Sequence, residues 1–511
     1  MATSDEPRQQ PLHILFFPFF AAGHLIPVAD MAALFAARGA RCTILTTPVN
    51  ADTIRPAVDR ANLHGTDSTS AVEISLMPFP DVGLPPGVEN VTALATLQVD
   101  YRANFMQAMQ LFREPFDRFL ADNHPVDAVV SDSFFTWSAD AAVEHGVPRL
   151  VFFGSSLFAR SCNECLLRNS PLETTTTSPE DNDGGRLVSL PGLPHRVEMR
   201  QSQMMDPGNH LWEFFQSNNA ADQRSFGEVF NSFQELEPDY VEHFRATLGR
   251  RAWLVGPVAL GTKANALPPG GGADSCLRWL DTKPAGSVVY VSFGTVSSFS
   301  PAELREIARS LDISGRNFVW VIGGAAATVD DWSEWMPEGF IELTADVDDS
   351  RGFIIRGWAP QRLILNHPAL AGFMTHCGWN SILEAVSAGV PMVTWPRYAD
   401  HFFNEKLVVE VLKVGVSIGA KDYASSLEAH EVIAGELIAR SITRLMGDSQ
   451  LEGDAIRKKA DELGVKARSA VEKDGSSYND VGRLLDELMA RRRCAAGAPR
   501  GGEEVRAADG S

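Results

Sequence analysis

The part of this chain that most constrains its fold is the stretch of 44 residues from Trp358 to His401. Within it, Gly372–Thr375 is a short apolar run that predicts a buried strand, and a helical pattern begins after the polar turn at 376–381. A turn of this kind points several backbone N–H groups outward, with the positive end of the helix dipole behind them. The 358–401 segment therefore predicts a binding site for a phosphate or a diphosphate.

Asp400 and His401 follow the next predicted strand, Met392–Trp395. Open α/β sheets bind their ligands outside the carboxyl ends of the strands. We therefore expect these two polar side chains to lie on the same ligand-binding edge as the turn at 376–381.

Strand and helix signals alternate along both halves of the chain. Predicted strands in the first half are His13–Phe17, Cys42–Thr46, Ile74–Met77, Ala128–Ser131 and Arg149–Phe153, with helices at His24–Arg38, Ala93–Leu120 and Phe135–His145. The second half adds strands at Val288–Phe293, Phe318–Ile322 and Phe353–Ile355 and a helix at Pro301–Leu311. This alternation predicts an α/β fold with parallel, doubly wound sheets that are covered on both faces.

At 511 residues the chain is too long for one hydrophobic core and suits two domains of about 200–250 residues each. The Gly- and Pro-rich stretch Gly261–Ala273 is the best linker, and the polar stretch Ser170–Arg186 predicts a loop or a disordered insertion. We expect an N-terminal domain over 1–255, a linker over 256–273, a C-terminal domain over 274–465, a helix over 466–493 that packs back on the N-terminal domain, and a disordered tail over 494–511.

The charge balance of 65 acidic and 45 basic residues gives a net charge of −20, which disfavours nucleic acid and anionic membranes as partners. No apolar run reaches the roughly 18 residues of a membrane span, and the polar N-terminus is not a signal peptide, so we expect a cytoplasmic protein. Cys162 and Cys165 form a single CxxC without a second pair at zinc spacing. We expect no bound metal and a monomer.

The 358–401 segment resembles the signature box of the plant secondary-product UDP-glycosyltransferases (family 1 glycosyltransferases). These inverting enzymes transfer a sugar from a UDP-sugar to a small lipophilic acceptor. The match runs through the whole box and includes Trp358, Gln361, His376, Trp379, Asn380, Ser381, Glu384 and Asp400. The resemblance implies the GT-B fold, in which two Rossmann-like domains face each other across a cleft, and a UDP-sugar that is a co-substrate and not a cofactor.

The resemblance also assigns roles in binding the UDP-sugar. Trp358 is expected to stack on the uracil ring, Ala359 to meet the edge of the base through its backbone, and Glu384 to bind the ribose hydroxyls, with Gln361 in the same set. For the diphosphate, it assigns Thr295, which follows the predicted strand Val288–Phe293, and His376 with Asn380 and Ser381 beside it. Trp379 and Asp400 are expected to hydrogen-bond the sugar.

A candidate general base, His24, stands where the first predicted helix begins, just after the strand His13–Phe17. A helix N-terminus depresses the pKa of a histidine and keeps its imidazole neutral, as a base requires. The alternative is that His24 only caps the helix. In the family a histidine after the first strand is the base, so the resemblance favours catalysis.

Asp132 ends the predicted strand Ala128–Ser131, on the same edge of the sheet as His24. A neutral histidine needs its second ring nitrogen anchored, usually by a carboxylate. The family pairs its base with an aspartate at this place, and DAVVSDSFFTW matches that local pattern. Aspartate is also a preferred helix N-cap, and both roles can hold at once.

The acceptor pocket is expected to come from the first half. Its candidate lining residues are Phe20, Phe134 and Ser155, with Phe19, Phe135, Trp137 and Phe158 nearby in the sequence. Taken singly, each aromatic residue is an ordinary core residue. Together they predict a planar or polycyclic acceptor such as a flavonoid, a triterpenoid or another phenolic.

His401 is where the chain departs from the glucose-using members of the family, most of which have Gln at this position. In some relatives a histidine here accompanies UDP-galactose or UDP-arabinose, because imidazole offers one donor and one acceptor on a shorter stem. We expect one of these two donors, with UDP-glucose as the alternative.

Two other enzyme classes with similar folds lack their motifs. The residues after the first strand, Phe19–His24, do not form the GxGxxG turn of NAD-dependent dehydrogenases, and no GxSxG elbow of an α/β-hydrolase is present. A non-catalytic relative that binds a nucleotide sugar is a third alternative, against which His24 and Asp132 argue.

Overall fold

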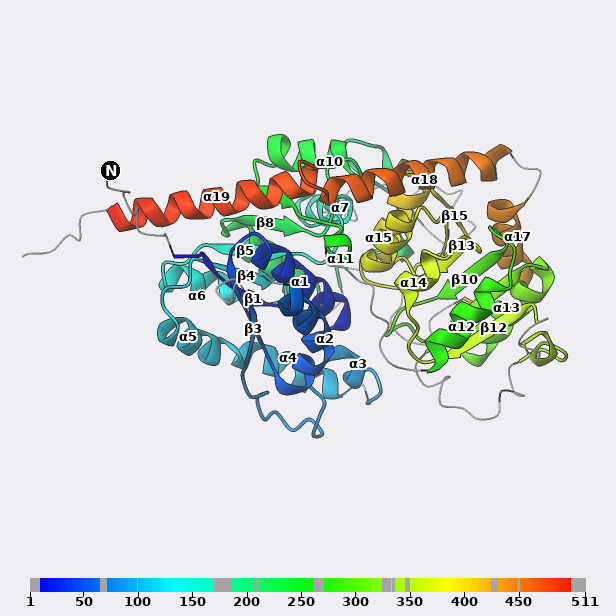
Figure 1. Cartoon of the computed structure of the whole chain (residues 1–511), viewed down its shortest axis with the longest axis horizontal. Coiled ribbons are helices and arrows are strands. Elements are labelled where there is room, and N and C mark those ends of the chain that lie inside the picture. Colours follow the sequence, from blue (N-terminus) through cyan, green and yellow to red (C-terminus); the bar gives the residue numbers. More distant parts are fainter. Residues whose placement is uncertain are drawn as a thin grey trace, which may run out of the picture.

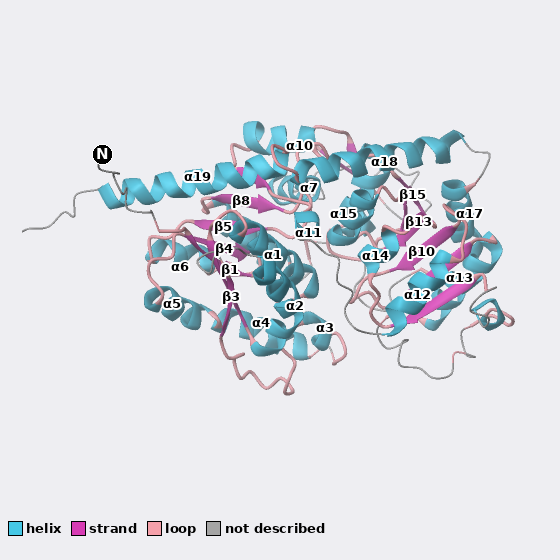
Figure 2. Ribbon diagram, viewed as in Figure 1, coloured by secondary structure: helices cyan, strands magenta, loops and turns pink. Residues whose placement is uncertain are grey.

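The computed structural model describes residues 10–64, 71–98, 100–169, 186–205, 207–208, 211–261, 271–323, 332, 336–344, 350–423, 431–447 and 451–497. Almost all of the predicted insertion Ser170–Arg186 lies outside these residues. The described chain forms two parallel sheets that lie side by side, each with helices packed against it (Figures 1 and 2). The predicted α/β fold with two doubly wound parallel sheets is confirmed.

The first sheet has seven parallel strands in the order β3-β2-β1-β4-β5-β8-β9. Its strands are β1 His13–Phe17, β2 Arg41–Thr46, β3 Val72–Leu76, β4 Ala128–Asp132, β5 Arg149–Phe152, β8 Gly227–Phe230 and β9 Ala252–Leu254. Alternate residues of β1 enter different cores: Ile14 packs with α1 (Ala22–Ala36), and Leu15 packs with α4 (Tyr101–Leu111). Because both faces of the central strand β1 are buried, it is buried along its whole length, whereas the edge strand β3 is only partly buried and contains Glu73.

The other helices of the first half are α2 Pro48–His64, α3 Val91–Leu94, α5 Arg113–Asp122, α6 Ser138–Glu144, α7 Leu157–Asn169, α9 Trp212–Gln223, α10 Pro238–Glu242 and α11 Val258–Gly261. A short antiparallel hairpin joins β6 Leu187–Leu190 to β7 Val197–Arg200. Helix α11 packs against α1 and lies inside the predicted linker 256–273. Within that linker, residues 262–270 lie outside the described part of the chain, and α12 begins at Gly271.

The second sheet has six parallel strands in the order β12-β11-β10-β13-β14-β15. They are β10 Val288–Ser292, β11 Asn317–Ile322, β12 Gly352–Arg356, β13 Leu370–Thr375, β14 Met392–Thr394 and β15 Gly415–Ser417. The helices are α12 Gly271–Asp281, α13 Pro301–Ser314, α14 Gln361–Leu365, α15 Trp379–Ala388, α16 His401–Lys406 and α17 Gly435–Met446.

Two long helices, α18 (Leu451–Val471) and α19 (Ser476–Gly497), run along one side of both sheets (Figure 1). Helix α18 packs on α15 and α17 of the second half, and α19 packs on β9 of the first. The helix predicted over 466–493 thus spans the end of α18 and most of α19, which are separated by a turn in which Asp474 has a φ of 70°. Helix α19 also continues to Gly497, so the first residues of the predicted disordered tail, 494–497, are helical; residues 498–511 lie outside the described part.

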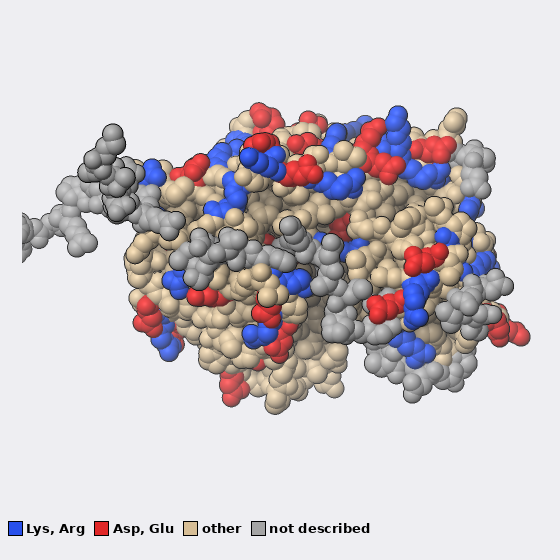
Figure 3. Space-filling view, in the orientation of Figure 1, with Lys and Arg blue, Asp and Glu red and all other residues tan. Residues whose placement is uncertain are grey.

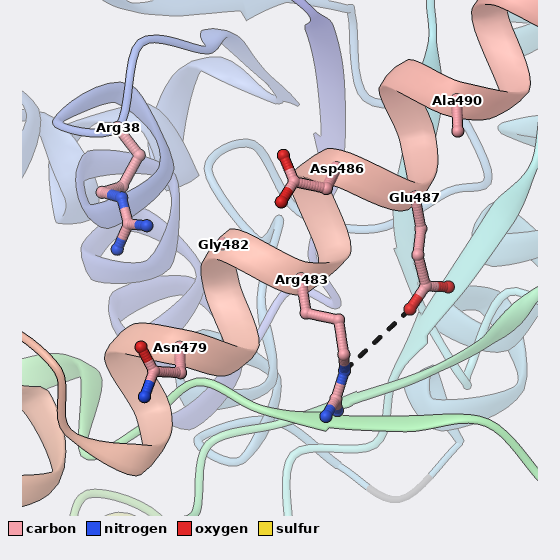
Figure 4. Close-up of a pocket in the computed structure, with 7 residues that line it drawn as sticks. All are labelled: Arg38, Asn479, Gly482, Arg483, Asp486, Glu487 and Ala490. Atoms are coloured by element: carbon pink, nitrogen blue, oxygen red, sulfur yellow. Dashed lines mark ion pairs between the residues drawn. The ribbon is translucent and has the colours of Figure 1, made fainter.

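Acidic and basic side chains are interspersed along α18 and α19 (Figure 3), and several pair with each other, as Arg483 does with Asp480 at 2.9 Å. A groove of about 580 Å³ lies between Arg38, just after α1, and α19 (Figure 4). Its other lining residues are Asn479, Gly482, Arg483, Asp486, Glu487 and Ala490, none of which is among the predicted site residues. In the described part of the chain, no helix is long and apolar enough to cross a membrane.

Candidate functional site

The strand order reverses once in each sheet, between β1 and β4 in the first and between β10 and β13 in the second. Ligands of open α/β sheets bind outside the carboxyl ends of the strands at such switch points. His24 lies shortly after β1, and Asp132 ends β4. Thr295 and His376 follow β10 and β13. The topology therefore brings the predicted residues of each half to that half's ligand-binding edge.

His24 and Asp132 form a direct pair, with Nδ1 of the imidazole 2.6 Å from Oδ2 of the carboxylate. The side chain of Asp132 is fully buried, whereas that of His24 is 20% exposed. A carboxylate on Nδ1 fixes the tautomer in which Nδ1 carries the hydrogen, so Nε2 has the free lone pair. The pair can therefore take a proton from a group that approaches Nε2.

The pKa of His24 is raised above its ordinary value of 6.5. Burial acts to lower the pKa, but the charge of Asp132, its hydrogen bond and the charge of Asp400 together outweigh the burial. The prediction that the helix N-terminus would depress this pKa is wrong, because two carboxylates near the ring act more strongly than the partial charge of a helix end. His24 is thus a stronger base than a free histidine, and it must lose its proton before it can act.

Asp132 makes a second contact, through Oδ1, which accepts a hydrogen bond from the backbone N–H of Phe134 at 3.1 Å. It does not cap the following helix, because α6 starts at Ser138 with Trp137 as its N-cap residue. The carboxylate instead closes a short turn after β4. Each of its oxygens therefore has a defined partner.

In the second half, His376 begins the loop that follows β13, and its ring lies against Gly294 in the loop that follows β10. A Cβ on Gly294, whose φ is 74°, would lie 2.8 Å from Cε1 of His376, so a side chain there would collide with the ring. Burial, followed by the proximity of His401, holds the pKa of His376 well below its usual range. Its Nδ1 is buried and has no hydrogen-bond partner among the described residues. A buried polar atom of this kind normally has a partner, which points to a ligand at this position.

The start of α15 adds donors beside His376. Trp379, Asn380 and Ser381 form its first turn, whose N–H groups have no partner within the helix. Thr295 is exposed on the facing loop after β10. Together these groups suit an anion such as a diphosphate. In the described part of the chain, no cluster of three His, Cys, Asp or Glu side chains could hold a metal.

Glu384 is oriented by Gln361, whose Nε2 donates to Oε2 of Glu384 at 2.7 Å and to Oγ of Ser381 at 3.0 Å. Burial raises the pKa of Glu384. Trp358 is 65% exposed, and Ala359 beside it is nearly buried. The exposed indole can stack on a flat ring, and Gln361 emerges as a residue that positions Glu384.

The two halves contact each other directly at the site. Nδ2 of Asn380 donates to the backbone oxygen of Gly23 at 2.7 Å, and Ser155 donates its hydroxyl hydrogen to Asp400. Nε1 of Trp379 donates to the backbone oxygen of Asn231 at 2.7 Å. The indole N–H of Trp379 therefore connects the two halves, and the expected role of Trp379 on the sugar stays a prediction.

Asn404 is a site residue that the sequence interpretation missed. Its Nδ2 donates to Oδ2 of Asp400 at 2.6 Å, and its Oδ1 accepts a hydrogen bond from Ser156 of the first half at 3.1 Å. It lies one helical turn after Asp400, and this i,i+4 spacing was the signal that could have identified it.

His401 is buried at the start of α16, with its ring 4.8 Å from that of His376 in a T-shaped contact. Burial, helped by the charge of Arg397, lowers its pKa to about 3, so the imidazole is neutral. Its Nδ1 also has no hydrogen-bond partner among the described residues. Among the described residues, the Nδ1 atom of His401 is therefore a polar atom without a hydrogen-bond partner, and it lies beside the turn at 376–381.

The aromatic residues predicted for the acceptor pocket separate into two groups. Phe134 lies beside His24, with ring centroids 5.8 Å apart, and stacks on Phe19 at 4.4 Å. Phe214 and Phe215 of α9, which the sequence interpretation missed, pack against Phe134. The prediction that Phe20 lines the pocket is wrong: its ring is fully buried in the core, as are Phe135 and Phe158, and Trp137 is nearly so.

Comparisons with known proteins agree with this geometry. A family model described as UDP-glucoronosyl and UDP-glucosyl transferase matches residues 273–446. The chain is 39% identical to an anthocyanin 3'-O-beta-glucosyltransferase of Gentiana triflora, covering 94% of this chain and 98% of the relative. It is 40% identical to a scopoletin glucosyltransferase of Nicotiana tabacum, covering 93% and 98%.

Solved structures give the same result. The crystal structure of Glycyrrhiza uralensis UGT73P12 complexed with glycyrrhetinic acid 3-O-monoglucuronide superposes with a TM-score of 0.85 at 35% identity, over 95% of this chain and 97% of that one. Medicago truncatula UGT71G1 complexed with UDP-glucose superposes with a TM-score of 0.75 at 25% identity, over 94% and 98%. The chain therefore belongs to the plant family 1 UDP-glycosyltransferases, enzymes with the GT-B fold.

Proposed function

We propose that this enzyme transfers a sugar from a UDP-sugar to a hydroxyl of a lipophilic phenolic acceptor, with inversion at the anomeric carbon. The observation that carries this proposal is the pair of His24 with the buried carboxylate of Asp132, beside the exposed edge of an aromatic cluster. Nε2 of His24 takes the proton of the acceptor hydroxyl while its oxygen attacks the anomeric carbon. The bond between that carbon and the diphosphate breaks, and UDP leaves with the electron pair. Asp132 stabilises the imidazolium that forms.

Transfer with inversion follows from a single displacement, in which acceptor and UDP occupy opposite sides of the anomeric carbon. His24, in the first half, would lie on the acceptor side of that carbon. For the leaving side, we assign the N–H groups at the start of α15, Thr295 and His376 to the diphosphate. Trp358 and Ala359 would bind uracil, and Glu384 would bind ribose.

For the sugar, we assign Asp400 and His401. Among the described residues Nδ1 of His401 has no hydrogen-bond partner, which supports a direct contact with a sugar hydroxyl. A short imidazole in place of glutamine favours UDP-galactose or UDP-arabinose. The Gentiana and Nicotiana relatives are named as glucosyltransferases, which supports UDP-glucose as the alternative donor.

For the acceptor, the stacked rings of Phe19 and Phe134 support a planar molecule whose hydroxyl reaches His24. The relatives are named for anthocyanin, scopoletin and flavonoid acceptors, all of them phenolic. A triterpenoid is the second candidate, because the Glycyrrhiza structure contains a glycyrrhetinic acid derivative.

A panel of four donors tests this function: UDP-glucose, UDP-galactose, UDP-arabinose and UDP-xylose. Each is mixed with a flavonoid, a coumarin or a triterpenoid, and both UDP release and the glycosylated product are measured. Acceptor-dependent UDP release is expected, with a product whose anomeric configuration is opposite to that of the donor sugar. UDP binding without turnover for any acceptor would favour a non-catalytic relative.

A further inference from the structure

One buried ion pair, Arg149 with Asp222, contacts three consecutive residues at the end of β4: Ser131, Asp132 and Ser133. Arg149 donates from Nε to Oγ of Ser131 at 2.7 Å and from a terminal nitrogen to the backbone oxygen of Asp132 at 3.3 Å. Ser133 donates from Oγ to Oδ2 of Asp222 at 2.6 Å. Asp132, which orients His24, is thus the central residue of a three-residue segment, and its neighbours Ser131 and Ser133 are both hydrogen-bonded to the ion pair.

The ions of this pair are almost completely removed from water. Arg149 and Asp222 have side chains that are 2% and 1% exposed, and their nearest atoms lie 3.2 Å apart. Removing two charges from water costs several kcal/mol each, so a buried ion pair is often no more stabilising than apolar residues of similar size. What apolar residues would not provide is the set of hydrogen bonds to Ser131, Asp132 and Ser133.

Further charged groups surround the pair. Arg160 lies 3.8 Å from Asp222 and 3.0 Å from Glu228, and Arg250 pairs with Glu164 at 3.0 Å and also with Glu228. In the described part of the chain, Glu228 makes no hydrogen bond to Ser131, Asp132 or Ser133, although it is buried like Asp222. The cluster therefore contains a natural control for the effect of removing one buried carboxylate.

Helix α9 connects the same pair to the aromatic cluster. Asp222 lies near the end of α9, whose first turns carry Phe214 and Phe215 against Phe134. Helix α9 therefore contacts the segment at and just after the end of β4 in two ways: through Asp222 of the ion pair and through the rings that pack on Phe134.

We propose that Arg149 and Asp222 are positioning residues that fix the carboxylate of Asp132 against His24. This proposal rests on the proposed function, in which His24 is the general base. The pair does not touch the substrate; it restrains the backbone and the neighbouring side chains of Asp132, and a displacement of about 1 Å in such a pair can cost about 10²-fold in rate.

The first test compares Asp222→Asn with Glu228→Gln, since each removes one buried carboxylate from the same cluster. We expect Asp222→Asn to lower kcat about 10–100-fold with the KM for the UDP-sugar unchanged, because the residues assigned to the donor lie on the other half. The NMR titration of the His24 ring, assigned by its absence in His24→Ala, should move to lower pH. Glu228→Gln should keep kcat and the titration within about two-fold and a few tenths of a pH unit of wild type.

The second test changes no charge and keeps the ion pair. Ser133→Ala removes the hydrogen bond to Asp222, whereas Ser225→Ala removes the 2.8 Å bond that Ser225 accepts from Arg149 outside the β4 segment. A several-fold loss of kcat and a lower His24 titration are expected for Ser133→Ala only. This comparison decides the question if Asp222→Asn fails to fold.

The positioning role would be overturned if Asp222→Asn and Glu228→Gln changed kcat and the His24 titration equally, and if Ser133→Ala and Ser225→Ala did so as well. If His24→Ala keeps its transfer activity, the proposed function fails instead. The NMR titration of His24 in the resting enzyme would then still test whether the ion pair fixes Asp132, so the two failures are distinguishable.

Discussion

Asn380, in the first turn of α15, donates a hydrogen bond to the backbone oxygen of Gly23, the residue directly before His24. The helix assigned to the diphosphate and the loop that carries the base therefore contact each other at 2.7 Å. The contact joins the side-chain amide of Asn380 to the backbone of Gly23, so it directly links the first turn of α15 to the residue before the proposed base.

Replacing His24 with alanine removes the proposed base and leaves every group assigned to UDP in place. We expect a loss of about 10²–10⁴-fold in transfer to a hydroxyl, the usual contribution of a general base. UDP affinity, measured by calorimetry, should stay within a few-fold of wild type. Activity close to that of wild type would show that His24 is not the base.

Asp132→Asn keeps the size of the side chain and an oxygen for the N–H of Phe134, but removes the charge that orients His24. We expect a loss of up to about 10⁴-fold in kcat, because the imidazole can adopt the wrong tautomer. Steady-state kinetics with a saturating donor measure the loss. Unchanged turnover would reduce Asp132 to a residue that closes the turn after β4.

The pH dependence of kcat/KM should report the raised pKa of His24. The base must be unprotonated, so the rate should fall as the pH drops through this pKa, and the midpoint of the fall should lie above 6.5. In Asp132→Asn the residual activity should fall at a lower pH, because the largest influence that raises the pKa is gone. A midpoint below 6.5 in the wild-type enzyme would contradict the assignment.

Gly154→Ala tests whether the position of the ring matters. A Cβ on Gly154 would lie 2.8 Å from Cε1 of His24, and the residue has a φ of 75°. Gly146 is the matched control, with a φ of 68° and no atom within 4 Å of its Cβ position. Both alanine variants should lose roughly 1–2 kcal/mol of stability from the left-handed backbone. Only Gly154→Ala should also lose about 10–100-fold in kcat; equal kcat values would mean that the ring tolerates displacement.

His401→Gln should shift the donor preference toward UDP-glucose, since glutamine places a donor and an acceptor on a longer, flexible stem. The measurement is the ratio of kcat/KM values for UDP-glucose and UDP-galactose with one acceptor. His401 lies beside His376, so overall activity is a less specific readout than this ratio. An unaltered ranking of donors would exclude His401 from sugar recognition.

The fold was largely predictable because its central strands are buried on both faces. The strand His13–Phe17 is predicted at its observed bounds, whereas the edge strand Gly415–Ser417, with only three residues, has no comparable apolar run. The pairing of His24 with Asp132 was predictable because Asp132 ends such a strand and His24 lies in the first turn of the helix that follows another. The raised pKa of His24 was not predictable, since it depends on Asp132 and on Asp400 of the other half.

Contacts between distant polar residues escaped the sequence interpretation. Nothing near Trp379 in the sequence indicates that its indole bonds to Asn231, and nothing near Asp132 indicates the pair of Arg149 with Asp222. Each pair depends on how separate elements pack, and each of these residues, taken alone, is of a type that is common in loops and at strand ends. Phe214 was missed for the same reason, because it reaches Phe134 from helix α9.

The placement of α19 also bears on how the protein is made. Val481, Leu484 and Leu488 lie in the same core as Ile14 of the first strand and Trp253. A ribosome releases β1 early and α19 late, so the layer that carries His24 stays open on one side until the second half has been synthesised. Until then, the apolar residues of the first half that pack on α19 lack these partners, and transiently exposed apolar surface of this kind is prone to aggregation.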